Sequence, residues 1–344
     1  MSAPEVTVLM TVFNGGRFLA PAMESILCQS WEDFEFVIVD DASTDGSVGV
    51  LNQFAANDRR IRLILNKENS GQTAGLNQGL REARGRWIAR QDADDLALPG
   101  RLAAQMSHAA RFPDLVLVGV NGWVIDEGGK RMGLIHVPLS DAGIRWSMPF
   151  QNPFIHPGVI FRRVMPGGNA VAYCEDFRIC QDWELWSRIA DEGRLANLPE
   201  RLVCYRDRRD SLSHRFSDDT RRECRAVSAA AWKKNFPGET LSEETALILE
   251  RFRGGLGPEQ FREFLEFYTP LRERWIAAHP SDAGARQADA VHLMQAAGGM
   301  MSGGRLAACG AMARAMAAAP LWTLGAIWDR VCLMGKQPSF VSGQ

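Results

Sequence analysis

Three carboxylates within four residues are the part of this sequence with the clearest capacity for chemistry. Asp92, Asp94 and Asp95 follow Arg86–Arg90, a run that reads as a strand. Like charges this close repel one another, so such a cluster persists when water solvates it or when a cation neutralises it. Carboxylates suit Mg²⁺ or Mn²⁺ held jointly with the phosphates of a substrate. A metal site and a solvated acidic loop are therefore the two interpretations of this segment.

Other classes of cation site and partner fit the sequence less well. An EF-hand calcium loop needs an oxygen ligand and a glycine where the chain has Leu96 and Ala97. The net charge of -2 over 344 residues provides no overall attraction for nucleic acid, so no nucleic-acid partner is expected. With 46% hydrophobic and 23% charged residues, the composition is that of a soluble protein with one large domain or two domains.

Cysteine usage and the N-terminal sequence indicate a cytoplasmic setting. Seven cysteines are scattered singly without paired spacing, and the first residues lack the basic and apolar regions of a signal peptide. The nearest approach to a long apolar tract, 306–327, contains Arg314 and the helix-breaking Pro320, so it does not predict a membrane span. We therefore expect a reducing, cytoplasmic location.

Alternating strands and helices are expected to position the acidic cluster. Strands are predicted at Val6–Val12, Phe36–Val39, Ile61–Leu65, Trp87–Arg90 and Leu115–Val118, and helices near 17–29, 73–84 and after Pro99. Near-continuous apolar strands are typical of a parallel sheet covered on both faces, whose ligands gather at the carboxyl ends of the strands. Phe13 and Asn14, Asp40 and Asp41, and the acidic cluster should therefore meet at one crevice.

The remaining sequence is less regular and then helical. Residues 126–153 are rich in Gly and Pro and predict irregular structure, with a lid or an acceptor-side insertion as its role. From about Ser217 the composition is helical. Large apolar residues recur at helical spacing between Trp322 and Val331. This stripe is interpreted as core or dimer surface, or as a peripheral membrane contact.

Four motifs in order resemble those of the inverting, nucleotide-sugar-dependent glycosyltransferases of family 2. The motifs are Pro4–Gly15, Val39–Ser47, Ala83–Asp95 and Gln181–Trp186, and Asn197–Arg206 follows the last of them. The resemblance implies the α/β GT-A fold, a Rossmann-like and mainly parallel sheet flanked by helices, over residues 1–215. Its donor half would be about 1–125 and its acceptor half about 126–215, with a helical C-terminal region at 216–344.

The resemblance also implies roles for residues on the donor side. Asp94 matches the metal ligand of the family's DxD motif, and Asp92 matches a residue at the metal site that contacts the donor's ribose or sugar. Asp95 would reach the metal through water or cap the helix after Pro99. The donor base would be bound by Thr11, Phe13 and Asp41, where an acid and an aromatic ring suit uridine or thymidine, and Asn14 would also bind substrate. Core packing for Phe13 and turn formation for Asp41 are the alternatives.

On the acceptor side, the resemblance makes Asp182 the general base that removes the proton of the attacking hydroxyl. The family's usual Glu-Asp is Gln181-Asp182 here, so the aspartate keeps the role. Glu184 follows at i+2 and would point elsewhere on a helix. Asp182 would also suit the cap of that helix. Trp183 would offer a stacking face to an acceptor sugar or belong to the core.

Three positions depart from the family pattern or have an uncertain place in it. His156 matches a histidine common in this branch and would line the acceptor side, although most lone histidines are structural. Arg208 stands where the family often has a histidine near the metal, and would contact the diphosphate unless His214 does so. Leu76 replaces a basic residue, for which Arg90 would substitute at the phosphates.

The expected function is transfer of one sugar from a nucleotide-diphosphate donor, UDP- or dTDP-linked, to a glycan or lipid-linked glycan acceptor. Mn²⁺ or Mg²⁺ would be the cofactor, and surface polysaccharide assembly the setting. Peripheral attachment to the inner face of the cytoplasmic membrane would accompany a lipid-linked acceptor. The alternatives are a nucleotidyltransferase, which leaves Asp182 without a role, and a catalytically silent nucleotide-sugar-binding protein.

Overall fold

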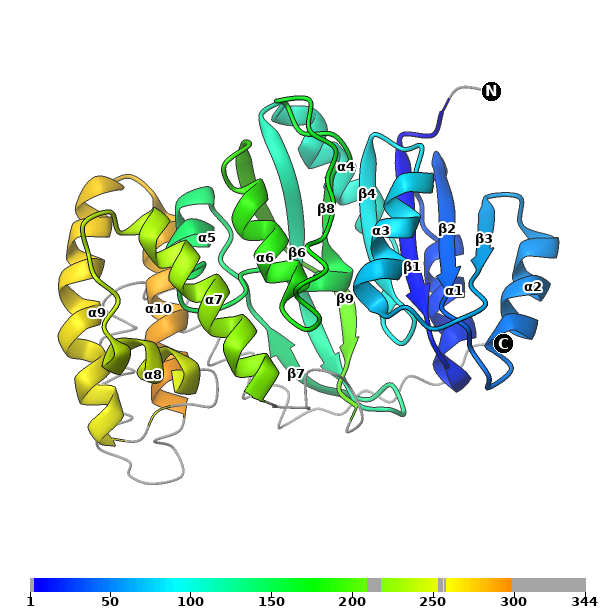
Figure 1. Ribbon diagram of the computed structural model, residues 1–344. Coiled ribbons are helices and arrows are strands. Elements are labelled where there is room, and N and C mark those ends of the chain that lie inside the picture. Colours follow the sequence, from blue (N-terminus) through cyan, green and yellow to red (C-terminus); the bar gives the residue numbers. More distant parts are fainter. Residues whose placement is uncertain (1–2, 209–217, 253–255, 257, 299–344) are drawn as a thin grey trace. The chain divides into compact units, whose positions relative to one another are not determined.

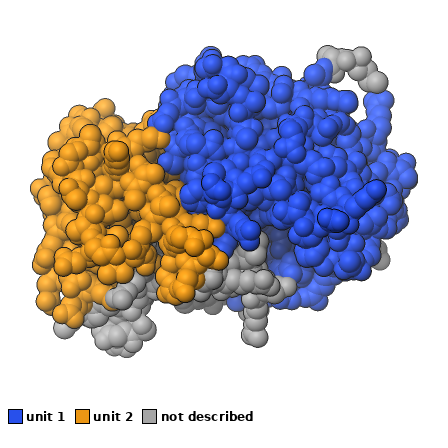
Figure 2. Space-filling model, viewed as in Figure 1, with its two compact units in different colours: residues 1–135, 154–214 blue, residues 136–153, 215–344 orange. Residues whose placement is uncertain are grey.

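The chain forms two compact units, each built from two separate stretches of sequence (Figure 2). The computed structural model describes residues 3–208, 218–252, 256 and 258–298. Unit 1 comprises residues 1–135 and 154–214, and unit 2 comprises 136–153 and 215–344. The carboxylates and the other predicted site residues all belong to unit 1.

Unit 1 is an α/β structure built around one mixed sheet (Figure 1). Its strands are β1 (Val6–Val12), β2 (Phe34–Asp40), β3 (Ile61–Leu65), β4 (Trp87–Asp92), β5 (Leu96–Ala97), β6 (Leu115–Ile125), β7 (Arg131–Ile135), β8 (Ile160–Arg162) and β9 (Arg194–Arg206). Its helices are η1 (Gly16–Phe18), α1 (Leu19–Leu27), α2 (Ser47–Asn57), α3 (Gln72–Glu82), α4 (Arg101–Arg111), η2 (His156–Gly158) and α6 (Gln181–Ile189).

The strand order places the carboxyl ends of β1, β2 and β4 side by side. The order is β3-β2-β1-β4-β8-β6-β9-β5, with β7 paired to β6. The strands from β3 to β4 are parallel, as expected, whereas β8 runs antiparallel to both β4 and β6. In this register Thr11 lies opposite Val39 on one side and Asp92 on the other. The sequence therefore predicted the crevice-forming strands correctly, and the sheet beyond them is mixed.

Burial explains why β1, β2 and their covering helix α3 assemble. All seven residues of β2 and six of the seven in β1 are buried, which is typical of a strand covered on both faces. Helix α3 lies against both strands. At Gly79 a Cβ atom would collide with the side chain of Leu9, so glycine at this position lets α3 approach β1 closely.

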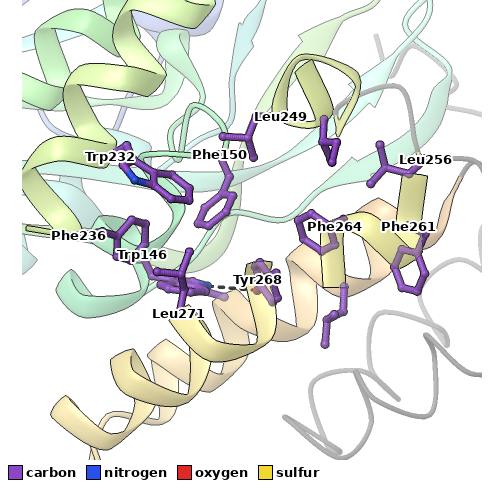
Figure 3. Close-up of a cluster of buried hydrophobic side chains, with 13 residues drawn as sticks. Trp146, Phe150, Trp232, Phe236, Leu249, Leu256, Phe261, Phe264, Tyr268 and Leu271 are labelled. Atoms are coloured by element: carbon purple, nitrogen blue, oxygen red, sulfur yellow. Dashed lines mark hydrogen bonds between the residues drawn. The ribbon is translucent and has the colours of Figure 1, made fainter. Parts of the chain in front are cut away.

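Unit 2 is helical and is held by an aromatic core (Figure 3). Its helices are α5 (Asp141–Ser147), α7 (Asp218–Asn235), α8 (Glu243–Phe252), α9 (Pro258–Ala278) and α10 (Ala283–Gly298). Trp146 and Phe150 pack edge to face against Phe236 and Tyr268. The expectation that residues 126–153 form one irregular acceptor-side segment is therefore corrected: 131–135 is strand β7, and 136–153 supplies aromatic anchors to unit 2.

Two expectations concern membranes. Among the described residues, no helix is both long and apolar enough to cross a membrane. The apolar stripe between Trp322 and Val331 lies outside the described residues. His214, the alternative phosphate contact, also lies outside them. Peripheral membrane contact through the C-terminal region stays a prediction.

Candidate active site

The acidic loop after β4 holds two partly exposed carboxylates, each beside an arginine. The Arg90 guanidinium donates a hydrogen bond to Asp92 Oδ1. Arg208 Nη1 donates to Asp94 Oδ2 at 3.0 Å. The Asp92 and Asp94 side chains remain 21% and 27% exposed, whereas that of Arg90 is 0% exposed. Arg90 is thus too deep to contact a diphosphate in this conformation, and its role is corrected to holding Asp92.

Asp95 connects the acidic loop to the end of β9. Its buried Oδ1 accepts the backbone N–H of Arg206 at 2.6 Å, and Arg206 Nε donates to the carbonyl of Asp94 at 2.8 Å. Burial and the charges of the two neighbouring carboxylates raise the pKa of Asp95 well above its ordinary value. Asp95 does not cap α4, because Gly100 is the capping residue and no side chain bonds there. Sequence reasoning missed the part played by Arg206.

The donor set of this loop suits an open divalent-cation site. Burial raises the pKa of Asp92, and the charge of Asp94 adds to this against the opposing charge of Arg90, so a cation bound at the loop would stabilise the ionised carboxylates. Among the described residues, no three His, Cys, Asp or Glu side chains converge on one point. Mg²⁺ and Mn²⁺ need no such cage when substrate phosphates supply ligands. Asp94 and Asp92 are the residues that fit this role.

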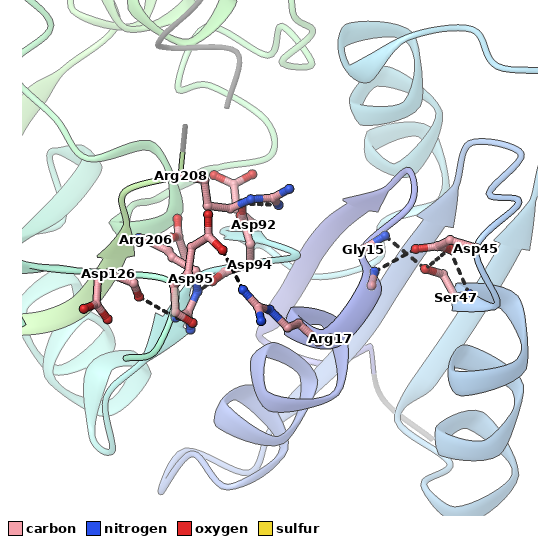
Figure 4. A network of polar contacts seen from close by, with 12 residues as sticks. Gly15, Arg17, Asp45, Ser47, Asp92, Asp94, Asp95, Asp126, Arg206 and Arg208 are labelled. Atoms are coloured by element: carbon pink, nitrogen blue, oxygen red, sulfur yellow. Dashed lines mark hydrogen bonds and ion pairs between the residues drawn. The ribbon is translucent and has the colours of Figure 1, made fainter. Parts of the chain in front are cut away.

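The loops after β1 and β2 are joined by hydrogen bonds. Asn14, at φ 53°, accepts from Thr44 N through its side-chain oxygen at 2.8 Å and donates its own N–H to Ser43 Oγ at 2.9 Å. Gly15 N donates to Ser47 Oγ, and Gly16 N to Asp45 Oδ2 (Figure 4). Asn14 therefore acts first as a link between the two loops.

Phe13, next to that link, is 54% exposed. An aromatic ring this accessible at the end of a buried strand is not a core residue, so the structure removes the core alternative for Phe13. Thr11 is partly buried and lies beside Asp92 in the sheet. The β1 end thus presents one stacking surface next to the acidic loop.

The acidic pair after β2 is used differently from what the sequence suggested. Asp41 is buried and accepts from Ser70 N, Ser70 Oγ, Gly71 N and Asn66 Nδ2. Burial alone would raise the pKa of Asp41, but these hydrogen bonds hold it below its ordinary value. Asp40 is also buried, and its Oδ2 has no hydrogen-bond partner among the described residues. Asp40 is therefore a ligand-binding candidate that sequence reasoning passed over, although it ends a strand at the predicted crevice.

Helix α6 presents Asp182 in its first turn. Asp182 is partly exposed and is not the capping residue, since Cys180 holds that position without a side-chain bond. Glu184 pairs instead with Arg188 at 2.6 Å, which removes it from competition for the base role. Trp183 is 2% exposed, so the expected stacking face for an acceptor is corrected to a core position.

Tyr173 lies in the irregular segment that precedes α6. Its buried hydroxyl is 3.1 Å from His156 Nε2. Burial raises the pKa of Tyr173, and the charges of Asp182 and Asp92 raise it further against the opposing effect of Arg90. Burial and Arg90 hold the pKa of His156 well below its ordinary value, so this imidazole is neutral. No sequence signal predicted the contact between Tyr173 and His156.

Comparison with known sequences identifies the family. The sequence model of glycosyl transferase family 2 matches residues 7–166. EpsE of Bacillus subtilis (strain 168), assigned as a glycosyltransferase, is 38% identical over 220 residues, which are 62% of this chain and 77% of EpsE. The amylovoran biosynthesis glycosyltransferase AmsE of Erwinia amylovora is 31% identical over 61% of this chain and 79% of its own. The O-antigen biosynthesis glycosyltransferase WbnJ of Escherichia coli is 30% identical over 58% and 79%.

Solved structures confirm the fold. Residues 1–349 of S. aureus TarS, in complex with UDP-GlcNAc, match with a TM-score of 0.56 at 14% identity, covering 95% of this chain and 92% of that one. The same part of TarS without that ligand matches with a TM-score of 0.53 at 16% identity. The expected GT-A arrangement of sheet and flanking helices is thereby confirmed. From the extent of the EpsE match and this shared fold, the chain belongs to glycosyl transferase family 2 and is a glycosyltransferase.

Proposed function

We propose that this enzyme transfers one sugar, with inversion, from a UDP- or dTDP-sugar to a glycan or lipid-linked glycan acceptor. The observation that carries the proposal is the register of β1, β2 and β4, which sets their carboxyl ends side by side with Thr11 opposite Asp92 at the start of the acidic loop. The setting in surface polysaccharide assembly is supported by AmsE and WbnJ, whose names specify amylovoran and O-antigen biosynthesis. Residues 1–125 would form the donor half, and 126–135 together with 154–214 the acceptor half.

Recognition of the donor base would use the ends of β1 and β2. The exposed ring of Phe13 can stack on a pyrimidine. An acid that accepts from the pyrimidine N–H then provides specificity. Asp41 already has its hydrogen-bond capacity filled by the loop 66–71, whereas the buried Asp40 Oδ2 has no hydrogen-bond partner in the described part of the chain. Asp40 therefore joins Asp41 as a candidate, and Thr11 completes the pocket.

The reaction needs a base on the acceptor and stabilisation of the leaving diphosphate. Asp182 accepts the acceptor hydroxyl proton while that oxygen bonds to the anomeric carbon and the bond to the diphosphate oxygen breaks. A divalent ion held by Asp94 and Asp92 would supply Lewis-acid stabilisation of the departing charge. Arg208, 3.0 Å from Asp94, adds a permanent positive charge at the position where many relatives would place a histidine.

The test is hydrolysis of a panel of nucleotide sugars with Mn²⁺ and with EDTA. We expect slow hydrolysis of one donor that EDTA abolishes and that Asp94→Asn reduces strongly. The amide would hold the divalent ion less well, so the positive charge that stabilises the leaving diphosphate would be lost. Asp126→Asn is the matched control, because the side-chain oxygen of Asp126 accepts a turn bond from Lys130 N and asparagine keeps that oxygen. Hydrolysis that continues unchanged in EDTA would contradict the metal role. Nucleotide binding without turnover of any donor would favour the silent binding protein.

A further inference from the structure

Helix α3 is hydrogen-bonded to both sides of the candidate site. At its N-terminal end, Gly71 N donates to Asp41 Oδ2 at 2.7 Å, which ties the helix to the end of β2. Along its length, Gln72, Thr73 and Asn77 bond the segment 173–181 that leads into α6. A single helix thus connects the donor-base side with the helix that carries the proposed base.

Asn77 makes the densest of these contacts. Its Nδ2 donates to the carbonyl of Tyr173 at 2.9 Å and to Glu175 Oε1 at 3.1 Å, while its Oδ1 accepts the N–H of Tyr173 at 2.8 Å. One buried amide therefore satisfies both backbone groups of Tyr173, as a neighbouring strand would. Thr73 Oγ1 adds a bond to the carbonyl of Phe177 at 3.0 Å.

The segment held by these side chains lacks the backbone hydrogen bonds of a helix or strand. Residues 171–180 contain no helix or strand, so their backbone groups rely on partners elsewhere. The same segment carries Tyr173, whose hydroxyl meets His156, and it leads directly into Asp182. Helix α3 itself is tightly packed. Gly79 lets the helix lie close against Leu9, and the side chain of Leu76 is fully buried.

We propose that Asn77 is a positioning residue that holds the segment 173–180, and through it Asp182, in line with the acidic loop. The inference rests on the proposed function, in which Asp182 is the base. Thr73 supports the same segment at a second point. Small displacements of a catalytic group cost rate far more than they cost binding of a remote substrate part. Loss of the Asn77 amide therefore lowers kcat and leaves donor binding unchanged.

The test measures kcat and donor KM for Asn77→Ala and Thr73→Val. We expect kcat to fall about 10–100-fold in Asn77→Ala and about 3–10-fold in Thr73→Val, with donor KM and nucleotide affinity within about twofold of wild type. Thr73→Ser, which keeps the hydroxyl, should restore kcat. Asn57→Ala is the matched control, because that exposed amide bonds only Gln53 O at the end of α2.

A double variant distinguishes positioning from a general structural role. If Asn77 acts through Asp182, then adding Asn77→Ala to Asp182→Asn reduces kcat little further. Additive losses, or a normal kcat in folded Asn77→Ala beside an active wild type, would overturn the inference. Absence of wild-type turnover with every donor would instead defeat the proposed function.

Hydrogen exchange provides a readout that needs no substrate. Peptides covering 171–181 should exchange faster in Asn77→Ala and in Thr73→Val than in wild type, while peptides of β1 and β2 keep their protection. Unchanged exchange across 171–181 in both variants would overturn the inference even if no donor were found.

Discussion

The strand ends of unit 1 and the helical core of unit 2 differ in how far they bury their polar side chains. In unit 1, Asp92 and Asp94 remain partly exposed and close together, which opposes folding but leaves oxygens available. In unit 2, the buried Tyr268 hydroxyl donates to the buried Asp289 at 2.9 Å, and Asp289 also accepts from Arg272 Nε. Unit 1 therefore leaves ion-paired carboxylates partly exposed at its strand ends, whereas unit 2 buries its hydrogen-bonded polar groups. Substitutions in the first should alter turnover and those in the second stability.

The largest expected effect is on the rate, at Asp182. Asp182→Asn should lower kcat about 10²–10⁴-fold, because the amide cannot accept the acceptor proton. The melting temperature should stay near that of wild type, since the partly exposed carboxylate is not a helix cap. Initial rates with the identified donor and calorimetric melting measure both. Glu184→Gln is the control, with a small effect on rate. A fall in stability without a fall in rate would break the contrast between the units.

The second prediction concerns the aromatic core of unit 2. Trp146→Ala should lower the free energy of unfolding by about 3–5 kcal/mol, because it leaves a cavity and removes the donor to Tyr268. Leu247→Ala, at an exposed position on α8, should change it by less than about 0.5 kcal/mol. Denaturant titration measures both. Equal effects of the two substitutions would show that the cluster is not the core of this unit.

The third prediction is acid sensitivity at His292, which lies 3.4 Å from the Tyr268 hydroxyl. Burial lowers the pKa of His292 from 6.5 to about 3. Between these values the unfolded chain binds a proton that the folded chain does not, so stability rises with pH and is lost as pH falls below 6.5. The loss should be on the order of 1 kcal/mol per pH unit.

His292→Phe isolates this effect from that of its neighbour Asp289. Burial raises the pKa of Asp289, which acts in the opposite direction: the folded chain holds that proton more tightly, so acid favours folding through Asp289. Denaturant titrations at several pH values below 6.5 should therefore show a shallower loss of stability in His292→Phe than in wild type. The same slope in both proteins would contradict the assignment to His292.

The smallest effect is expected at the link between the loops after β1 and β2. Asn14→Gly keeps the positive φ but removes the bond from Thr44 N, and should cost about 0.5–1.5 kcal/mol. Asn14→Ala should cost more, because alanine is also strained at φ 53°. Thermal melts of the two variants measure the difference. Greater stability of Asn14→Ala would show that backbone strain is not stored at this link.

Local sequence signals were enough for the fold and for part of the site. Buried apolar runs predicted β1, β2 and β4, and the acids that follow them lie at adjacent strand ends, as expected. The roles of side chains at those ends were harder to predict. Trp183 has the residue type of a sugar platform, but only the packed structure shows that its ring is buried.

The sequence by itself determined the strands β1, β2 and β4, the acidic loop and the family, because these depend on residues close together in the chain or on motifs that relatives share. The tertiary structure decided which oxygens are available. The carboxylate oxygens of Asp41 accept hydrogen bonds from a loop 25–30 residues away in the sequence. Asn77 is hydrogen-bonded to Tyr173, which is 96 residues away. Residues 136–153 likewise joined the aromatic core of unit 2. Such contacts form only when distant segments are folded together, so residue type and local spacing cannot specify them.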